Sequence, residues 1–393
     1  MTKKAYYDEP FIKEFTARVT SNIREGELSR VGLERTYFYP DSGGQPHDTG
    51  KMDGHDVVNV IVDGGEIYHL VDGDIGDGEV ACRIDWDRRM DHMQQHTGQH
   101  ILSQAIFKVI GKGSESLHIG RETSSIDIES GDIAPSQIDE IERVANGAVM
   151  EDLPIETYIV DSTKGLDLRK ETCLDGDIRI VDIKGYDMTP CGGTHLDRTG
   201  KVGPIKILKW YRKGRYQRIE FVCGWRCIKT MQTNGTALQS LGNMLMVPVG
   251  EVYGKVEGIE EERRELIRRT KALEESLMEE TARRLLDEAP THRGMKVMHG
   301  VMENLPLVQH ICKLATEDEG TVCLLASPAK KGAILTFGSS KGSGVDVSKI
   351  LRETLDKLGG KGGGGQNYAS GSCSDTADLS AVLEEAANGI KGN

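Results

Sequence analysis

The feature that most constrains the fold of this chain is a highly charged stretch at residues 256–289. Ile259, Leu266 and Leu273 recur in it every seven residues, three later leucines continue a looser apolar stripe, and the other residues are mostly Glu and Arg. This spacing predicts a long helix, which could form a short coiled coil or a helical hairpin between two domains. An ordinary amphipathic surface helix fits equally well, because Arg263 interrupts the repeat.

The first 90 residues show the short period that is typical of β-strands. The apolar runs 57–62 and 66–71 flank Asp63-Gly64-Gly65, which is the pattern of a β-hairpin. Gly and Asp turn signals recur at short spacing elsewhere in this segment. We therefore expect a glycine-rich β-barrel over residues 1–88.

The period changes near residue 88. The following residues up to Ile110 place His96, His100, Ile101 and Ala105 at helical spacings, and Gly111 is a helix-ending residue. A second helix is expected at 136–146, and mixed strands and loops at 155–221. Helices over strands predict an α+β domain at residues 89–245.

The rest of the chain is expected to hold a helical linker at 246–290 and a small glycine-rich α/β domain at 291–393. The patterns in that domain predict adjacent buried strands at 321–326 and 333–337 and a helix at 351–358. Its glycine tract at 359–365 indicates either a flexible linker or a loop whose backbone amides cradle phosphates. The tract is not a Walker loop, because the Gly-Lys-Ser/Thr ending is absent.

Composition indicates a cytoplasmic protein. Charged residues make up 28% and hydrophobic residues 37%, no apolar run reaches membrane-spanning length, and the N-terminus lacks an apolar signal core. Eight scattered cysteines favour metal binding or plain thiols over a disulfide scaffold. The net charge of −13 argues against a non-specific nucleic-acid coat, although local patches decide whether a specific site exists.

Two pairs of residues have metal-ligand spacing. His96 and His100 lie four apart on a predicted helix, so both imidazoles share one face. Cys191-Gly192-Gly193-Thr194-His195 supplies a second pair, and its glycines permit a tight loop. Together the pairs predict one Zn²⁺ per chain. The alternative is that only one pair converges.

Other cysteines and histidines fit a metal site less well. Cys223 and Cys227 lack suitable partners nearby in the sequence and are interpreted as ordinary thiols. His92, four residues before His96, is expected at the surface or in a supporting role. The segment from Thr36 to Gln45 contains a Pro-Asp-Ser-Gly-Gly turn, which either lets the backbone approach a ligand closely or is a plain barrel turn.

A basic stretch lies between residues 198 and 229. It carries ten basic residues and one acid, Glu220, for a net charge of +9, with Trp210, Tyr211 and Tyr216 interleaved. Basic side chains mixed with aromatic rings fit an RNA backbone and an unstacked end nucleotide, although a solvated basic strand pair is the alternative. The predicted RNA-binding residues are Lys209, Arg212, Lys213, Arg215, Arg218 and, in the glycine tract, Lys361.

The motifs His96-Thr97-Gly98-Gln99-His100 and Cys191-Gly192-Gly193-Thr194-His195, preceded by Thr36 through Gln45, resemble the editing domain of alanyl-tRNA synthetases and the free-standing AlaX editing proteins. The strand Arg218 to Gly224 and the glycine tract at 359–365 extend the resemblance to a long-form AlaX. It implies that His96, His100, Cys191 and His195 bind zinc and that Thr36 and Gln45 lie near the substrate. The family often has His-Thr-Ala-Thr-His, so Gly98 and Gln99 are a departure here.

The resemblance implies a hydrolase that edits in trans, because the barrel begins almost at residue 1 and leaves no room for an aminoacylation domain. The expected reaction is deacylation of mischarged tRNA(Ala), chiefly Ser-tRNA(Ala) and also Gly-tRNA(Ala), by water attack at the zinc site. Thr36 is the candidate for contact with the serine hydroxyl. A homodimer through the C-terminal region is a further expectation.

Two other classes of function remain open at this point. One is a non-catalytic, zinc-stabilised tRNA-binding protein. The other is a metal-dependent hydrolase of a small substrate, although the sequence contains no Asp-His-His motif of the kind that phosphoesterases use.

Overall fold

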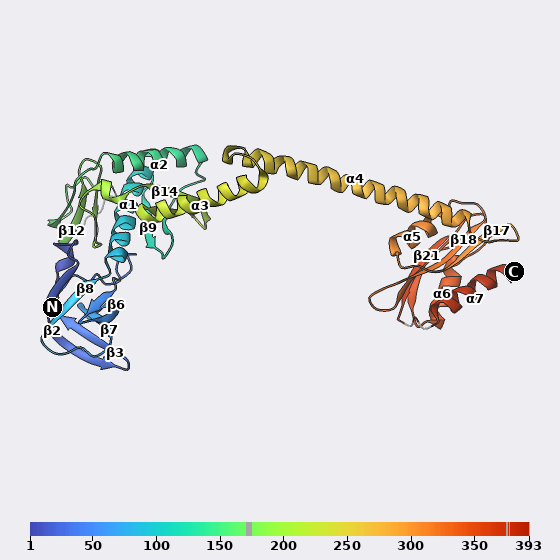
Figure 1. Cartoon of the computed structure of the whole chain (residues 1–393), viewed down its shortest axis with the longest axis horizontal. Coiled ribbons are helices and arrows are strands. Elements are labelled where there is room, and N and C mark those ends of the chain that lie inside the picture. The colour runs from blue at the N-terminus through green and yellow to red at the C-terminus, as the bar shows by residue number, and fades with distance from the viewer. Residues whose placement is uncertain (170–174, 375, 377, 393) are drawn as a thin grey trace. The chain divides into compact units, whose positions relative to one another are not determined.

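The computed structural model of the chain describes residues 1–169, 175–374, 376 and 378–392. By internal contacts the chain divides into two compact units, Met1–Met244 and Leu245–Asn393 (Figure 1). Each unit has hydrophobic cores of its own. The finer division into four segments stays a prediction, and Cys173 lies outside the described residues.

The N-terminal strands close into a barrel. In order around the ring they are β2 (Glu14–Glu25), β3 (Leu28–Leu33), β7 (Glu66–Asp72), β6 (His55–Asp63), β5 (Gly50–Met52) and β8 (Glu79–Ile84). The predicted hairpin is confirmed, since Asp63 pairs with Glu66 across Gly64 and Gly65, which both have positive φ angles. The short strands β1 (Lys3–Lys4) and β4 (Arg35–Thr36) pair beside the barrel, with the 3₁₀ turn η1 (Ala5–Tyr7) after β1.

The predicted helix after the barrel is confirmed as α1 (Trp86–Ile110). The Asp85 side chain accepts a hydrogen bond from the amide of Arg88 at its start, and Gly111 ends it with a φ of 68°. Most side chains of α1 are buried, polar ones included. Gly98 is required by this packing, because a Cβ there would lie 2.3 Å from Cys223 Sγ.

Two antiparallel sheets and a second helix complete the core around α1. One sheet has the order β14 (Ile205–Lys213), β15 (Tyr216–Cys223), β10 (Ser124–Ile128) and β9 (Ser114–Ile119). The other has the order β11 (Ile155–Ser162), β12 (Asp175–Ile183) and β13 (Asp187–Pro190). The predicted second helix is α2 (Pro135–Met150), which packs on α1 and β14. The 3₁₀ turn η2 (Thr199–Val202) joins the same core, so the α+β prediction is confirmed.

Helix α3 (Gly224–Leu245) was not predicted from the sequence. Only Gly224, Cys227 and Gly242 are buried along it. Its apolar residues are therefore too sparse on the buried side to give a clear helical period.

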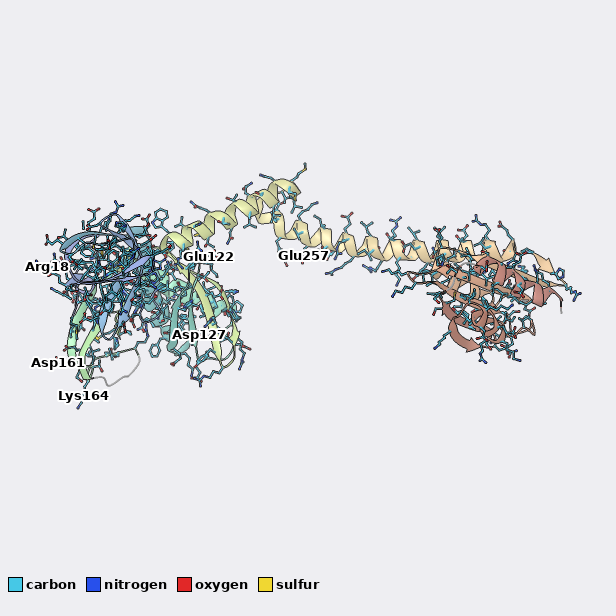
Figure 2. The ribbon with its side chains drawn as sticks, turned by 90° about the horizontal axis from the view of Figure 1, so that it is seen from below. Arg18, Glu122, Asp127, Asp161, Lys164 and Glu257 are labelled. Carbon is cyan, nitrogen blue, oxygen red and sulfur yellow. The ribbon has the colours of Figure 1, made fainter. Side chains whose placement is uncertain are left out.

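The second unit begins with η3 (Val249–Glu251) and α4 (Val252–Asp287), which confirms the long charged helix. Its buried residues are Val252, Ala282 and Leu286, while the heptad residues Leu266 and Leu273 are exposed. Figure 2 shows side chains projecting all along α4, Glu257 among them. The coiled coil stays a prediction. No helix in the described part of the chain is both long and apolar enough to cross a bilayer.

A mixed sheet follows α4. Its order is β16 (Thr291–His292), β17 (Met295–Val301), β18 (Thr321–Pro328), β19 (Ala333–Ser339), β21 (Tyr368–Cys373) and β20 (Lys361–Gly365). The helices are α5 (Leu305–Leu314), α6 (Val347–Lys357) and α7 (Leu379–Gly392). The predicted strands at 321–326 and 333–337 are confirmed as antiparallel neighbours, and α6 confirms the predicted helix. The linker interpretation of the glycine tract is wrong, because β20 pairs with β21 as an edge strand.

Candidate metal centre

Four predicted ligands converge from two distant segments. His96 and His100 project from one face of α1, and Cys191 and His195 come from the loop after β13. Their candidate ligand atoms all lie within 4.8 Å of one another. The three imidazoles are buried and Cys191 is half-buried. The structure therefore brings both pairs together.

The geometry of these atoms fits a metal ion. Cys191 Sγ lies 3.3 Å from both His96 Nε2 and His195 Nε2. Ligands at zinc bond lengths of about 2.0–2.3 Å in a tetrahedron stand roughly 3.3–3.6 Å apart. His100 Nε2 is buried without a hydrogen-bond partner among the described residues. A nitrogen whose lone pair binds a metal ion is expected to show this. One sulfur and three nitrogens are a set that suits Zn²⁺.

The charges in the cluster are consistent with a cation at its centre. Burial alone would raise the pKa of Cys191, but His96 and His195 outweigh it, so this pKa falls well below its ordinary value. Burial lowers the pKa of His195 to about 3. Burial opposes charge on His100 as well, but Asp187 and the Cys191 sulfur raise its pKa to about 9. The site thus stabilises a thiolate together with positive charge beside it.

Neighbouring polar groups contact the second nitrogen of each imidazole. Gln45 Oε1 lies 2.8 Å from His96 Nδ1, Asp187 Oδ2 lies 3.4 Å from His100 Nδ1, and Thr97 Oγ1 lies 3.3 Å from His195 Nδ1. Contacts of this kind orient the rings and leave Nε2 free to bind a metal ion. Asp187 is itself held by Arg169 at 3.0 Å.

These supporting residues show what the sequence could and could not reveal. Sequence reasoning did not identify Thr97, Asp187 or Arg169. Thr97 lies inside the His96–His100 motif and could have been found from it. Asp187 and Arg169 have no motif to mark them.

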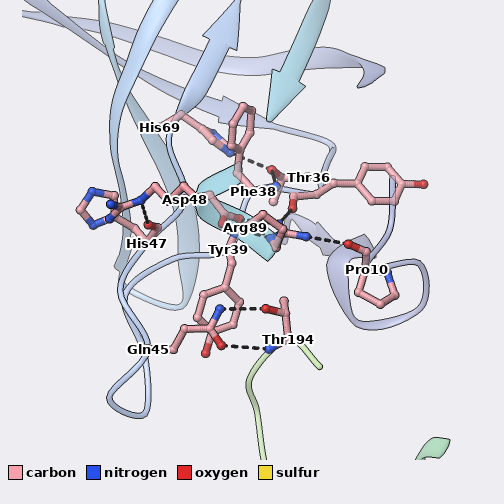
Figure 3. Close-up of polar contacts among 12 residues, drawn as sticks. Pro10, Thr36, Phe38, Tyr39, Gln45, His47, Asp48, His69, Arg89 and Thr194 are labelled. Atoms are coloured by element: carbon pink, nitrogen blue, oxygen red, sulfur yellow. Dashed lines mark hydrogen bonds and ion pairs between the residues drawn. The ribbon is translucent and has the colours of Figure 1, made fainter. Parts of the chain in front are cut away.

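Gln45 is brought to the cluster by the Pro-Asp-Ser-Gly-Gly turn. Besides His96 it contacts Thr194, donating to Oγ1 at 2.8 Å and accepting from the amide at 3.2 Å (Figure 3). Gly44 allows this approach, because a Cβ there would lie 2.3 Å from the carbonyl oxygen of Leu117. Gln45 therefore ties the barrel loop to both ligand segments.

Gly193 lets the ligand loop pack closely against His96 of α1. A Cβ at this position would lie 2.1 Å from Cε1 of His96. The Cys-Gly-Gly-Thr-His loop can therefore reach α1 only with glycine at its third position.

Thr36 has a different environment. It is fully buried, its Oγ1 lies 2.8 Å from His69 Nε2, and it accepts a hydrogen bond from the amide of Phe38 (Figure 3). His69 Nδ1 contacts the carbonyl of Val31 at 3.0 Å and must donate there. Burial lowers the pKa of His69 to about 4, so the ring is neutral and Nε2 accepts the Thr36 proton. Thr36 thus keeps one acceptor position and no donor.

The remaining residues singled out by sequence are not members of the candidate ligand set. Cys223 and Cys227 are buried, and burial raises the pKa of both thiols, as ordinary core thiols would show. His92 is buried, so the expectation of a surface position is wrong. Lys361 is exposed at the sheet edge on β20.

The predicted RNA-binding residues of the basic stretch lie on the β14–β15 hairpin, and several are paired with acids. Arg218 makes two bonds to Asp127 of β10, at 2.6 and 2.7 Å, and Lys209 pairs with Glu220 at 3.4 Å. Arg215 lies 3.9 Å from Glu129. Within the part of the chain that the structure describes, Arg212 and Lys213 form no ion pair. Figure 2 marks Asp127 on this sheet.

Comparison with known proteins gives one family match and several relatives. The family model described as "Threonyl and Alanyl tRNA synthetase second additional domain" matches residues 178–220, which include Cys191 and His195. The chain is 33% identical to "Alanyl-tRNA editing protein AlaX-L" of Pyrococcus horikoshii, and the alignment covers 94% of both chains.

Longer proteins match as well. The chain is 33% identical to "Alanine--tRNA ligase" of Pyrococcus abyssi over 98% of this chain, but it spans only 43% of that protein. The enzyme of the same name from Methanopyrus kandleri is 30% identical over 94% of this chain and 42% of its own length. A solved structure, the C-Ala domain from Aquifex aeolicus alanyl-tRNA synthetase, matches at 19% identity over 27% of this chain and 99% of its own, but the TM-score of 0.25 supports no conclusion.

Proposed function

Since the chain belongs to the AlaX-L family of alanyl-tRNA editing proteins, we propose that it is a hydrolase that removes wrongly attached amino acids from tRNA(Ala). The substrate is chiefly Ser-tRNA(Ala), and Gly-tRNA(Ala) is a second one. Water attacks the aminoacyl ester beside the metal centre. The observation that carries this proposal is the convergence of His96, His100, Cys191 and His195.

The four ligands would hold one Zn²⁺, which would act as a Lewis acid or orient the ester when bound. The chain's own contribution is to keep the donor atoms in place. Gln45 holds His96, and Asp187 holds His100, so two rings are oriented by contacts on their other nitrogen. Burial of the imidazoles keeps bulk water from competing with these contacts.

Selectivity follows from hydrogen bonding. Serine differs from alanine by one hydroxyl, and an apolar pocket rejects such an analogue poorly. A site that offers a buried polar partner to the hydroxyl discriminates strongly, because alanine would leave that partner unsatisfied. We propose Thr36 for this role, with its one remaining lone pair accepting from the serine hydroxyl. Thr36 already donates its hydroxyl proton to His69, so it can only accept a hydrogen bond from the substrate. Its whole side chain is buried.

A direct experiment follows from this proposal. The protein is incubated with Ser-tRNA(Ala), Gly-tRNA(Ala) and Ala-tRNA(Ala), and release of each amino acid is followed. We expect fast release of serine, release of glycine, and little release of alanine. Retained tRNA binding without any release would favour a non-catalytic tRNA-binding protein. Hydrolysis of small esters alone would favour a hydrolase of free small molecules.

For the tRNA itself we propose two contact regions. Arg212 and Lys213 at the β14–β15 hairpin have no competing ion pair within the described ranges, so they are available to phosphates more than Lys209, Arg215 or Arg218. In the second unit Lys361 projects from an edge strand that is otherwise glycine, which lets a phosphate backbone come close.

A truncation tests the role of the second unit. A fragment that ends at Met244, the last residue of the first unit, should keep its metal and hydrolyse Ser-tRNA(Ala). It should bind tRNA more weakly, and log K should depend less steeply on log salt. Unchanged affinity and salt slope, together with a change from dimer to monomer in sedimentation, would instead assign the second unit to dimerisation.

A further inference from the structure

Arg179 of β12 lies against the loop that carries two of the metal ligands. Its Nη1 donates to the carbonyl oxygens of Cys191 and Gly193, both at 2.9 Å. The guanidinium is therefore fixed at Cys191 itself and at the residue two positions after it, although Arg179 belongs to none of the recognised motifs. Two carbonyl contacts use only part of its donor capacity, because a guanidinium carries five N–H groups.

Arg179 differs from comparable arginines in its ion pairing. Buried or half-buried Arg89, Arg169 and Arg226 in the same unit each contact a carboxylate, Asp48, Asp187 and Asp91 respectively. Among residues whose positions are described, Arg179 forms no such ion pair. Within the described ranges this half-buried cation is therefore left without a carboxylate of its own.

The Tyr7 ring also contacts the Arg179 guanidinium. The Arg179 guanidinium lies 4.9 Å from the centre of the Tyr7 ring, within cation–π range. Tyr7 is half-buried and packs edge-on against Tyr6 at 4.6 Å between ring centres. The Tyr7 hydroxyl lies close to the ligand loop, because a Cβ on Gly192 would be 3.4 Å from it.

We propose that Arg179 binds the 5′-phosphate of the terminal nucleotide of the aminoacyl-tRNA, with Tyr7 as the residue that positions the guanidinium. This deepens the proposed function and depends on it. Guanidinium groups are well suited to phosphate because their N–H groups match its oxygens in pairs. In the terminal nucleotide only one ribose separates this phosphate from the ester. When the ester lies at the metal centre, the phosphate therefore lies close to it, and Arg179 beside the ligand loop is placed to bind it. The competing explanation is that Arg179 only fastens the loop through its carbonyl contacts.

Two small substrates that differ by one phosphate separate these explanations. They are 2′(3′)-O-seryl-adenosine and its 5′-monophosphate. The intact protein should hydrolyse the phosphorylated ester with a kcat/KM about tenfold to a hundredfold higher, as expected for charge-assisted hydrogen bonds. Arg179→Met should remove this advantage, so that the ratio of the kcat/KM values for the two esters falls to about one. Arg179→Lys should keep part of the advantage, and Arg143→Gln, which removes an exposed charge on α2, should change neither rate.

Binding and metal content complete the test. Calorimetry with 5′-AMP and adenosine should show a preference for the phosphate in the intact protein and none in Arg179→Met, with one zinc per chain in both. Tyr7→Leu leaves the carbonyl contacts intact and should reduce the same preference severalfold. If Arg179→Met loses its fold, Tyr7→Leu therefore distinguishes phosphate binding by Arg179 from a purely structural role.

The contradicting results are also distinct. Equal loss on both esters in Arg179→Met and Tyr7→Leu, or equal rates of the intact protein on both esters, would overturn the inference. Failure of the intact protein on both esters and on Ser-tRNA(Ala) would overturn the proposed function, while the AMP preference would still report on Arg179.

Discussion

The candidate metal centre and the RNA-binding surface were both predicted from local sequence, and the two predictions fare differently in the structure. The predicted RNA-binding residues of the basic stretch lie on the β14–β15 hairpin. At the metal centre every predicted ligand meets the others, and contacts from outside the motifs hold the rings in place. On the hairpin, acids from elsewhere in the chain neutralise part of the charge counted in the sequence. Asp127 binds Arg218, and Glu142 of α2 binds Lys206.

The difference has a physical cause. Ligand motifs place donor atoms by helix and loop geometry, which the sequence determines locally. The net charge of a surface depends on which acids the fold brings beside it, and those acids can come from any segment. A count of +9 within one stretch is therefore an upper limit on the charge that a partner meets.

The largest expected effect concerns the metal ligands. His100→Ala should abolish zinc binding and lower deacylation of Ser-tRNA(Ala) by about a hundredfold or more, because the metal's contribution is several kcal/mol. Metal analysis and single-turnover rates measure both. His118→Ala, at an exposed histidine, is the matched control and should change neither. Full zinc occupancy in a His96→Ala, His100→Ala double variant would contradict the ligand assignment.

The second effect separates orientation from ligation. Gln45→Leu removes the contact to His96 and both contacts to Thr194, so zinc affinity or activity should fall about 10–100-fold. In Gln45→Glu, which keeps the acceptor oxygen, zinc affinity or activity should fall less. Competition with a zinc chelator measures the affinity, and Gln239→Leu on α3 is the exposed control. Wild-type affinity in Gln45→Leu would show that the contact is incidental.

The third effect tests the buried hydroxyl. Thr36→Val leaves His69 Nε2 without its donor, so the free energy of unfolding should fall by about 1–3 kcal/mol. If Thr36 also accepts from the serine hydroxyl, discrimination between Ser-tRNA(Ala) and Ala-tRNA(Ala) should fall by a similar amount. Thr36→Ser keeps the hydroxyl and should restore both. Loss of stability with unchanged selectivity would limit Thr36 to a structural role.

The smallest effect concerns the hairpin. Arg212→Ala and Lys213→Ala should each reduce the slope of log K against log salt by about one unit, with little change in the rate at saturating tRNA. Arg218→Ala should change the slope less, because Asp127 already occupies its guanidinium. Filter binding over a range of salt concentrations measures these slopes. A larger effect at Arg218 than at Arg212 would reverse the ranking that the ion pairs imply.

Much of the fold could be predicted where one periodicity dominates a segment. The β6–β7 hairpin, α1, α4 and the pair β18–β19 were all expected. Helix α3 was missed because few of its residues are buried. The glycine tract was misinterpreted because glycine has low strand propensity, whereas here close packing against β21 selects it: a Cβ on Gly364 would lie 2.4 Å from Cα of Ala369.

The candidate site shows the same limit. The convergence of the two pairs could be predicted because their spacing encodes their geometry. The departure at Gly98 could not be explained from sequence, since its cause is Cys223, far along the chain. Asp187 was also beyond reach, because a single carboxylate gains its role only when the fold sets it beside His100.

The central claim is that His96, His100, Cys191 and His195 form one metal centre at which deacylation takes place. Protein stripped of metal with a chelator is titrated with Zn²⁺, and release of serine from Ser-tRNA(Ala) is measured at each step. We predict that the rate rises from near zero and levels off at about one equivalent of zinc per chain, while His100→Ala stays inactive throughout. Full activity of the stripped protein, or a rate that does not respond to zinc, would contradict the account.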